Sequence, residues 1–129
     1  MKPDFEKYSL ALIKNNKVVY SSDKPGLRPL VNCIAKNKEK KDCALHDKVI
    51  GLAAAKLVFN SGIAEKIVTS IISKPAFDFL KDKLVVEYDE IVKNILNTER
   101  KVICPMEKKA LELDEASFLR HVNKIFNQE

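Results

Sequence analysis

The chain lacks the features that mark several large classes of protein. No stretch of its 129 residues approaches the ~18 apolar residues of a membrane span, and the opening MKPDFEKYSL has no apolar signal segment. The cysteines, Cys33, Cys43 and Cys104, are odd in number and form no CxxC pair, in a chain long enough to fold without disulfides. We therefore expect a cytoplasmic protein with free thiols and no membrane partner.

Charges of one sign are not concentrated anywhere in the chain. The formal net charge of +5 comes from 23 basic and 18 acidic residues. The densest basic run, KNKEKKD at 36–42, contains neither arginine nor an interleaved aromatic residue. Nucleic-acid-binding proteins gather such residues in a stripe, so we interpret this run as solvated and expect no nucleic-acid partner. The mild basic excess favours an anion as ligand.

Hydrophobic residues make up 46% of the chain, enough for the core of one domain over residues 1–129. Two strand-like runs, YSLALIK and KVVYSS, flank Asn15 and Asn16, and this pattern predicts a tight hairpin because asparagine tolerates positive φ. The run RPLVNCIAKN then has apolar residues at helical spacing behind a first-turn proline, which predicts a short helix.

A central buried helix is predicted between Asp47 and Gly62. Asp47 is a suitable N-cap, Gly62 is suited to the C-terminal end, and the residues between them are apolar nearly all round except Lys56. In the rest of the chain, predicted strands continue to alternate with predicted helices. The predicted elements are a strand KIVTSII, a helix from Ser73-Lys74-Pro75, a strand LVVEY, a short helix DEIVKNIL, a strand RKVIC, a helix PMEKKALEL and a terminal helix at about 115–127.

Strands that alternate with helices favour a mostly parallel sheet covered on both faces. The predicted fold class is therefore α/β, with the initial hairpin as an antiparallel edge. In such sheets, ligands bind beyond the carboxyl ends of the strands, where helix N-termini present unpaired N–H groups. Three junctions carry polar residues at that place: His46-Asp47-Lys48, Ser73-Lys74-Pro75 and Cys104-Pro105-Met106-Glu107.

The third junction is a candidate for thiol chemistry. Cys104 falls at the predicted N-cap and Glu107 at the third helical position, which is a capping-box arrangement with sulfur in place of the hydroxyl. The helix N-terminus, Lys108 and Lys109 favour the thiolate, whereas Glu107 and burial oppose it. The sequence thus leaves both a buried structural Cys104 and a reactive Cys104 open.

Other candidates also have two interpretations. Asp47 is suited to capping its helix, Lys48 is suited to solvent, and Arg28 is suited to binding a phosphate or carboxylate. Cys43 and His46 have a CxxH spacing that would allow zinc binding together with Cys104, but no complete ligand set or adjacent glutamate accompanies them. We therefore expect no metal and no cofactor, and the chain contains no GxGxxG, P-loop or GxSxG motif.

Four segments resemble a known family. They are DKVIGLAAAKLV, the strand-to-helix step at SKPA, VEYDEIV and CPME. These segments are similar to the small prokaryotic family called Domain of Unknown Function 1893, from the hairpin to about Leu113. The resemblance implies a three-layer α/β/α domain with a cytidine-deaminase-like fold, on which the terminal helix packs.

The motif residues of zinc-dependent deaminases are absent from the matching positions of this chain. Such enzymes have His or Cys followed two residues later by Glu, and Pro-Cys-x-x-Cys at a second helix. Here Pro75 is followed by Ala76, and Phe79 occupies the second cysteine position. His46 is followed two residues later by Lys48 in place of glutamate. Deamination through a zinc-bound hydroxide is therefore not expected.

Three hypotheses about function remain. The leading one is binding of a small anionic or nucleotide-like ligand, in a pocket lined by Asp47, Lys48, Ser73, Lys74, Cys104 and Glu107, with Arg28 beside it. The second is a non-zinc enzyme with Cys104 as nucleophile, Lys48 as an electrostatic or proton-transfer partner and Asp47 or Glu107 as base. The third is an interaction module that uses the terminal helix and the edge strand, with a homo-oligomer as one form of assembly.

Overall fold

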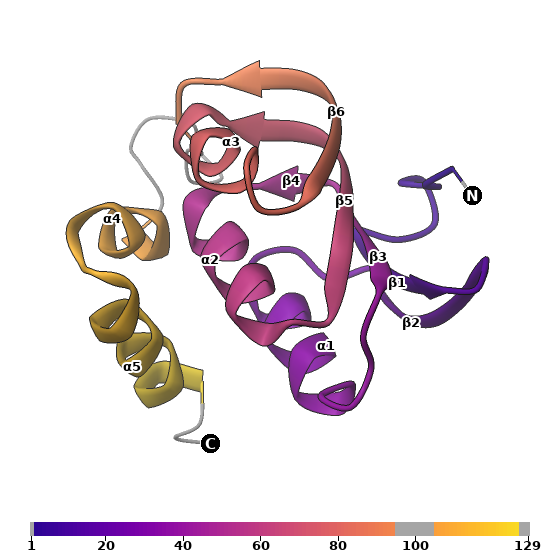
Figure 1. The fold of residues 1–129 in the computed structure, drawn as a ribbon, viewed down its shortest axis with the longest axis horizontal. Coiled ribbons are helices and arrows are strands. Elements are labelled where there is room, and N and C mark those ends of the chain that lie inside the picture. The colour runs from indigo at the N-terminus through magenta and orange to yellow at the C-terminus, as the bar shows by residue number, and fades with distance from the viewer. Residues whose placement is uncertain (1, 95–104, 127–129) are drawn as a thin grey trace.

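The computed structural model describes residues 2–94 and 105–126, which form a mixed α/β fold (Figure 1). The strands are β1 (Leu10–Lys14), β2 (Lys17–Ser22), β3 (Cys43–Asp47), β4 (Val49–Ile50), β5 (Ala64–Ser73) and β6 (Val85–Val92). The helices are α1 (Arg28–Lys36), α2 (Leu52–Ser61), α3 (Lys74–Leu80), α4 (Pro105–Glu112) and α5 (Glu115–Phe126). None of these helices has the length and apolar character of a membrane span.

The sheet is open and has six strands, in the order β2-β1-β3-β5-β4 with β6 on the outer side of β5. β1 is antiparallel to β2 and β3, whereas β5 is parallel to β3, β4 and β6. The predicted mixed sheet with an antiparallel hairpin is confirmed. The hairpin turns at Asn15 and Asn16, whose φ angles of 53° and 62° suit the tight primed turn.

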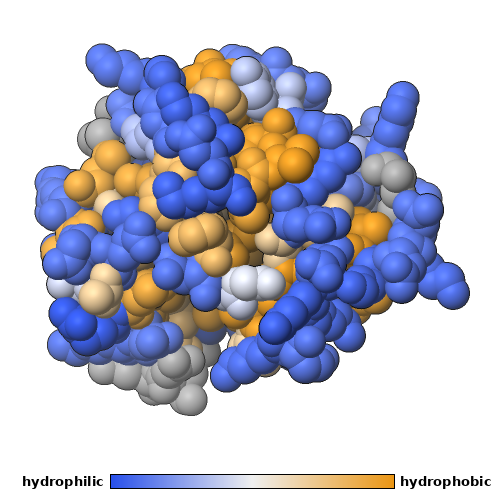
Figure 2. Space-filling model, viewed as in Figure 1, coloured by the Kyte–Doolittle hydropathy of each residue, from blue (hydrophilic) through white to orange (hydrophobic). Residues whose placement is uncertain are grey.

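The described helices lie on one side of the sheet in two tiers (Figure 1). The crossovers from β3 to β5 and from β5 to β6 move in the same direction across the sheet, so right-handed connections place α2 and α3 on the same face. α1 packs beside α2, and α4 and α5 form the outer tier on α2. On the side seen in Figure 2, hydrophobic surface is broken into patches by hydrophilic side chains.

The opposite face carries the N-terminal segment, residues 2–9. Tyr8 fixes this segment, since its hydroxyl accepts a hydrogen bond from the Asp4 backbone N–H at 3.0 Å and lies 3.1 Å from His46 Nδ1. His46 is buried in β3, and burial lowers its pKa, which favours a neutral imidazole as the hydrogen-bonding partner of Tyr8. Within the described residues, helices thus cover one face of the sheet and an extended segment covers part of the other, whereas the predicted three-layer arrangement has helices on both faces.

The central helix is shorter than predicted. It begins at Leu52, with Gly51 as N-cap, and ends at Ser61; Gly62 follows as C-cap, with a φ of 71° that suits the C-terminal role predicted for it. The prediction that Asp47 caps this helix is wrong, because Asp47 ends β3. Val49 and Ile50 form β4 and pair with β5, so pairing within the sheet overrides the continuous helical pattern.

The predicted helix DEIVKNIL is also wrong over residues 89–92. β6 continues to Val92, in regular register with β5, and Glu90 pairs with Ile71. The β-branched Ile91 and Val92 suit this strand. Residues 95–96, the predicted strand at 100–104 and Cys104 lie outside the described residues.

Lys56 links α2 to the outer tier of helices. The residue is 8% exposed, and its ammonium donates hydrogen bonds to the carbonyl oxygens of Ala110 at 2.8 Å and Leu113 at 3.3 Å. These carbonyls lie at the C-terminal end of α4, where backbone acceptors lack helical partners. The ammonium also lies 5.7 Å from the ring centroid of Phe118 in α5. A residue that interrupts the apolar pattern of α2 therefore anchors both C-terminal helices.

Replacing Lys56 with methionine tests this link. Lys56→Met nearly keeps the length of the side chain but removes both hydrogen bonds, which leaves the carbonyls of Ala110 and Leu113 without this donor. We expect the free energy of unfolding in urea to fall by about 1–3 kcal/mol. Lys108→Met, at an exposed position of α4, is the control and should change it little. A Lys56→Met protein as stable as wild type would show that apolar packing replaces the ammonium without loss.

Candidate functional site

Three of the predicted site residues, Arg28, Ser73 and Lys74, have partners within the fold. Arg28 begins α1, and its guanidinium lies 4.9 Å from the ring centroid of Phe126. Ser73 is fully buried and caps α3, since its hydroxyl accepts a backbone N–H of the first turn at 3.2 Å. Lys74 is exposed and pairs with Asp78, four residues later, at 2.7 Å. Ser73 therefore has the ordinary structural role of a helix cap, and Lys74 that of a partner in a helix-surface ion pair.

Glu107 has a role that its place in the sequence does not suggest. It is 3% exposed, and its carboxylate accepts hydrogen bonds from the backbone N–H groups of Leu52 at 2.6 Å and Ala53 at 2.8 Å. It therefore caps α2, a helix 55 residues earlier in the chain, in addition to lying in the first turn of α4. Burial raises the pKa of Glu107, while the two N–H groups and the charge of Lys56 lower it.

Gly51 provides the space for this carboxylate. A Cβ atom at Gly51 would lie 2.7 Å from Oε1 of Glu107. The glycine has an ordinary extended backbone, so close approach and not a positive φ requires it. The N-terminus of α2 thus holds an anion supplied by the chain itself, and an external carboxylate or phosphate would have to displace Glu107.

Asp47 is a half-buried acidic residue at the end of β3. Part of the residue is exposed, but protein surrounds the carboxyl group, and burial raises its pKa to about 8. Backbone N–H groups of Lys48 and Val49 bond to this carboxyl and oppose the shift. The raised pKa favours the protonated acid, a state in which Asp47 can donate a hydrogen bond or a proton.

The described cysteines are poor nucleophiles. Cys33 and Cys43 are buried, free thiols. Burial, together with the charges of Cys43 and Asp47, raises the pKa of Cys33 to about 12, and burial also raises the pKa of Cys43. Among the residues that the structure describes, no group of three His, Cys, Asp or Glu side chains could hold a metal ion. The reactivity of Cys104, outside those residues, stays a prediction.

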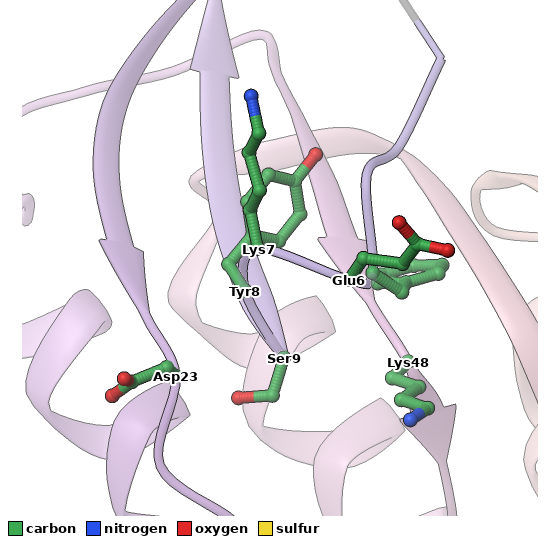
Figure 3. A pocket seen from close by; sticks show the side chains of 7 residues that line it. Glu6, Lys7, Tyr8, Ser9, Asp23 and Lys48 are labelled. Carbon is green, nitrogen blue, oxygen red and sulfur yellow. The ribbon is translucent and has the colours of Figure 1, made fainter.

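Lys48 lies at a small pocket on the side of the N-terminal segment. This Lys48 pocket has a volume of about 150 Å³ and is lined by Phe5, Glu6, Lys7, Tyr8, Ser9, Asp23 and Lys48. The side chains of Lys7 and Lys48 point in opposite directions (Figure 3), so the two ammonium groups do not converge on one anion. The Ser9 hydroxyl also lies within hydrogen-bonding distance of two backbone carbonyls, at 3.1 and 2.6 Å.

A larger pocket lies between the N-terminal segment, β5 and β6. This β6 pocket has a volume of about 320 Å³ and is lined by Pro3, Phe5, Val68, Thr69, Ser70, Glu87, Tyr88 and Asp89. Sequence reasoning missed it because Asp89 was placed in a helix. Interpreted as a strand, VVEYDEIV puts Glu87 and Asp89 on one face, since side chains alternate with a period of two.

The close approach of Gly51 and Glu107 predicts a non-additive pair of substitutions. Gly51→Ala should displace the carboxylate and weaken the α2 cap in the wild-type background. In a Glu107→Ala background there is no carboxylate to displace. We expect Gly51→Ala to cost about 1–3 kcal/mol more in the first background than in the second, as measured by urea unfolding of all four proteins. Equal costs would contradict a direct contact.

The raised pKa of Asp47 predicts a dependence of stability on pH. The folded protein keeps this proton up to about pH 8, whereas the unfolded chain loses it near 3.8, so this group's contribution to stability falls as pH rises between those values. Asp47→Asn removes the proton equilibrium. We expect the unfolding free energy of Asp47→Asn, relative to wild type, to increase from pH 5 to pH 8.5. The exposed Asp82→Asn control should show no such trend.

The chain matches a protein family over residues 4–126, and no curated protein sequence matches it. The fold is similar to the crystal structure, at 2.70 Å resolution, of a DUF1893 family protein (TM1506) from Thermotoga maritima. The two share 28% identity with a TM-score of 0.85, over 94% of this chain and 82% of the other. Neither description names a deaminase, so a deaminase-like fold stays a prediction. The chain belongs to the TM1506 family, a domain of unknown function (DUF1893).

Proposed function

We propose that this chain is an interaction domain that receives an extended segment of a partner protein along β6. The outer edge of β6 carries the proposal. β6 has eight residues in regular register with β5, and no described strand pairs with its outer side. The free N–H and C=O groups of such an edge form a template for an added strand.

Apolar side chains on both faces of β6 support the same docking edge: Val85 and Ile91 share one face, and Tyr88, whose ring contacts Phe77, lies on the other. Val85 is 59% exposed, Tyr88 41% and Ile91 37%. A single exposed apolar residue is ordinary on a protein surface, but three on one edge strand provide cross-strand contacts for an incoming segment.

The other edge of the sheet is built differently. β2 begins with Lys17, and its register with β1 shifts between Leu12 and Ile13. A bulge and a lysine are devices by which edge strands avoid pairing with other chains. The regular register of β6 has neither device, which favours β6 as the docking edge.

The charges of β6 favour a basic partner. Glu87, Asp89 and Glu90 lie on this strand, although the chain as a whole has a net charge of +5. Antiparallel pairing of two copies of β6 would oppose Glu87 to Asp89 when centred on Tyr88, or Asp89 to itself when centred on Asp89. Directly opposed like charges destabilise a strand pair, so a second copy fits less well than a segment rich in lysine or arginine.

Binding of a small anionic or nucleotide-like ligand at the three predicted junctions has less support. Glu107 already occupies the N–H groups at the start of α2, and Ser73 occupies one at the start of α3. Lys48 lies at a different pocket, on the side of the N-terminal segment. A catalytic role for Cys104 has no support from the described residues, since Cys104 lies outside them.

A synthetic peptide as long as β6, with alternating valine and lysine, tests the proposal. We expect saturable binding that weakens with added salt, together with slower hydrogen exchange of β6 backbone amides in the complex. Glu90→Lys should weaken binding about fivefold, because it replaces an attraction with a repulsion. Glu39→Lys, at an exposed acid between α1 and β3, is the matched control and should bind as wild type does.

Two results would count against strand addition. One is equal binding of a peptide in which glutamate replaces lysine, or in which central prolines prevent strand formation. The other is strong protection of all β6 amides in the free monomer, which would mean that its outer edge is already paired.

A further inference from the structure

We infer that the β6 pocket binds one cationic side chain, a lysine or an arginine, of the segment that docks on β6. This inference rests on the proposed function and adds the chemistry that would select the partner. The pocket lies on the face of the sheet that bears the N-terminal segment, and β6 forms one of its walls. A strand added at the edge would therefore have side chains beside its opening.

The walls of the pocket differ in chemistry. Glu87 and Asp89 supply carboxylates on the β6 side, whereas Pro3 and Phe5 supply apolar surface from the N-terminal segment and Val68 supplies it from β5. Lysine and arginine have the matching combination of an apolar stem and a charged end. The Phe5 ring adds a π face that attracts a cation.

One of the two carboxylates already binds a cation from the chain itself. The ammonium of Lys66 in β5 lies 2.6 Å from Oε2 of Glu87, and both side chains are partly exposed. The local geometry of β5 and β6 therefore accommodates an ammonium at this height of the sheet. Lys66 neutralises Glu87 but leaves the second carboxylate for a ligand.

Asp89 is that second carboxylate. It is exposed, and it forms no ion pair within residues 2–94 and 105–126. Two residues along a strand span about 6.6 Å, so a cation at Asp89 need not displace Lys66 from Glu87. The volume of about 320 Å³ exceeds what one side chain fills, and it falls at the lower end of the range for ligand pockets.

A blocked arginine, N-acetyl-arginine amide, tests the pocket without the rest of a peptide. We expect it to shift the amide resonances of Val68, Ser70 and Asp89, with an affinity that falls as salt is added. The equivalent blocked citrulline has nearly the same shape without the charge and should bind about tenfold more weakly. Asp89→Asn should weaken arginine binding about tenfold, whereas Glu39→Gln should leave it unchanged.

The results of these experiments distinguish failure of the cation pocket from failure of strand addition at β6. Equal shifts from blocked arginine and citrulline, or no loss in Asp89→Asn, would overturn the cation pocket. If the lysine-valine peptide still binds β6 in that case, strand addition stands and only the pocket assignment fails. Binding of blocked arginine without binding of the peptide would retain the pocket and overturn strand addition.

Discussion

Glu107 and Lys56 exchange hydrogen bonds between α4 and α2, and the position of the C-terminal helices depends on this exchange. The carboxylate of Glu107 binds the free N–H groups of α2, and the ammonium of Lys56 binds the free carbonyls of α4. Each buried charge thus meets backbone groups whose partial charge has the opposite sign. Gly51 makes the approach possible because it has no Cβ in the path of the carboxylate.

This exchange also decides where a binding surface can form. In an open sheet with helices beyond its strands, the N-terminus of a central helix is an ordinary place for an anionic ligand. Here the chain's own carboxylate fills that place. The two pockets described above instead lie on the opposite face, beside the N-terminal segment that Tyr8 fixes to His46. Among the described strands, β6 is the longest at an edge of the sheet. Both features favour a partner that approaches this side of the sheet.

The predicted elements that proved correct have local causes. Asn15 and Asn16 tolerate the positive φ of the hairpin, Gly62 ends α2 in the left-handed conformation, and Ser73 caps α3 with its own hydroxyl. The errors arose where two patterns overlap. Residues 49–50 and 89–92 include apolar residues that suit either a strand or a helix, and pairing with β5 selected the strand in both segments.

The sequence by itself determined the alternation of strands and helices and the hairpin, because spacing and turn chemistry act over a few residues. It also predicted the free thiols of Cys33 and Cys43 from the number and spacing of the cysteines. It also pointed to Glu107 as a first-turn acid of a helix. Only the tertiary structure decided that Glu107 caps α2, that Lys56 is buried against α4, and that Glu87 and Asp89 share a pocket with Phe5. These contacts join residues far apart in the chain, and their partners depend on strand order and helix packing, which local patterns do not encode.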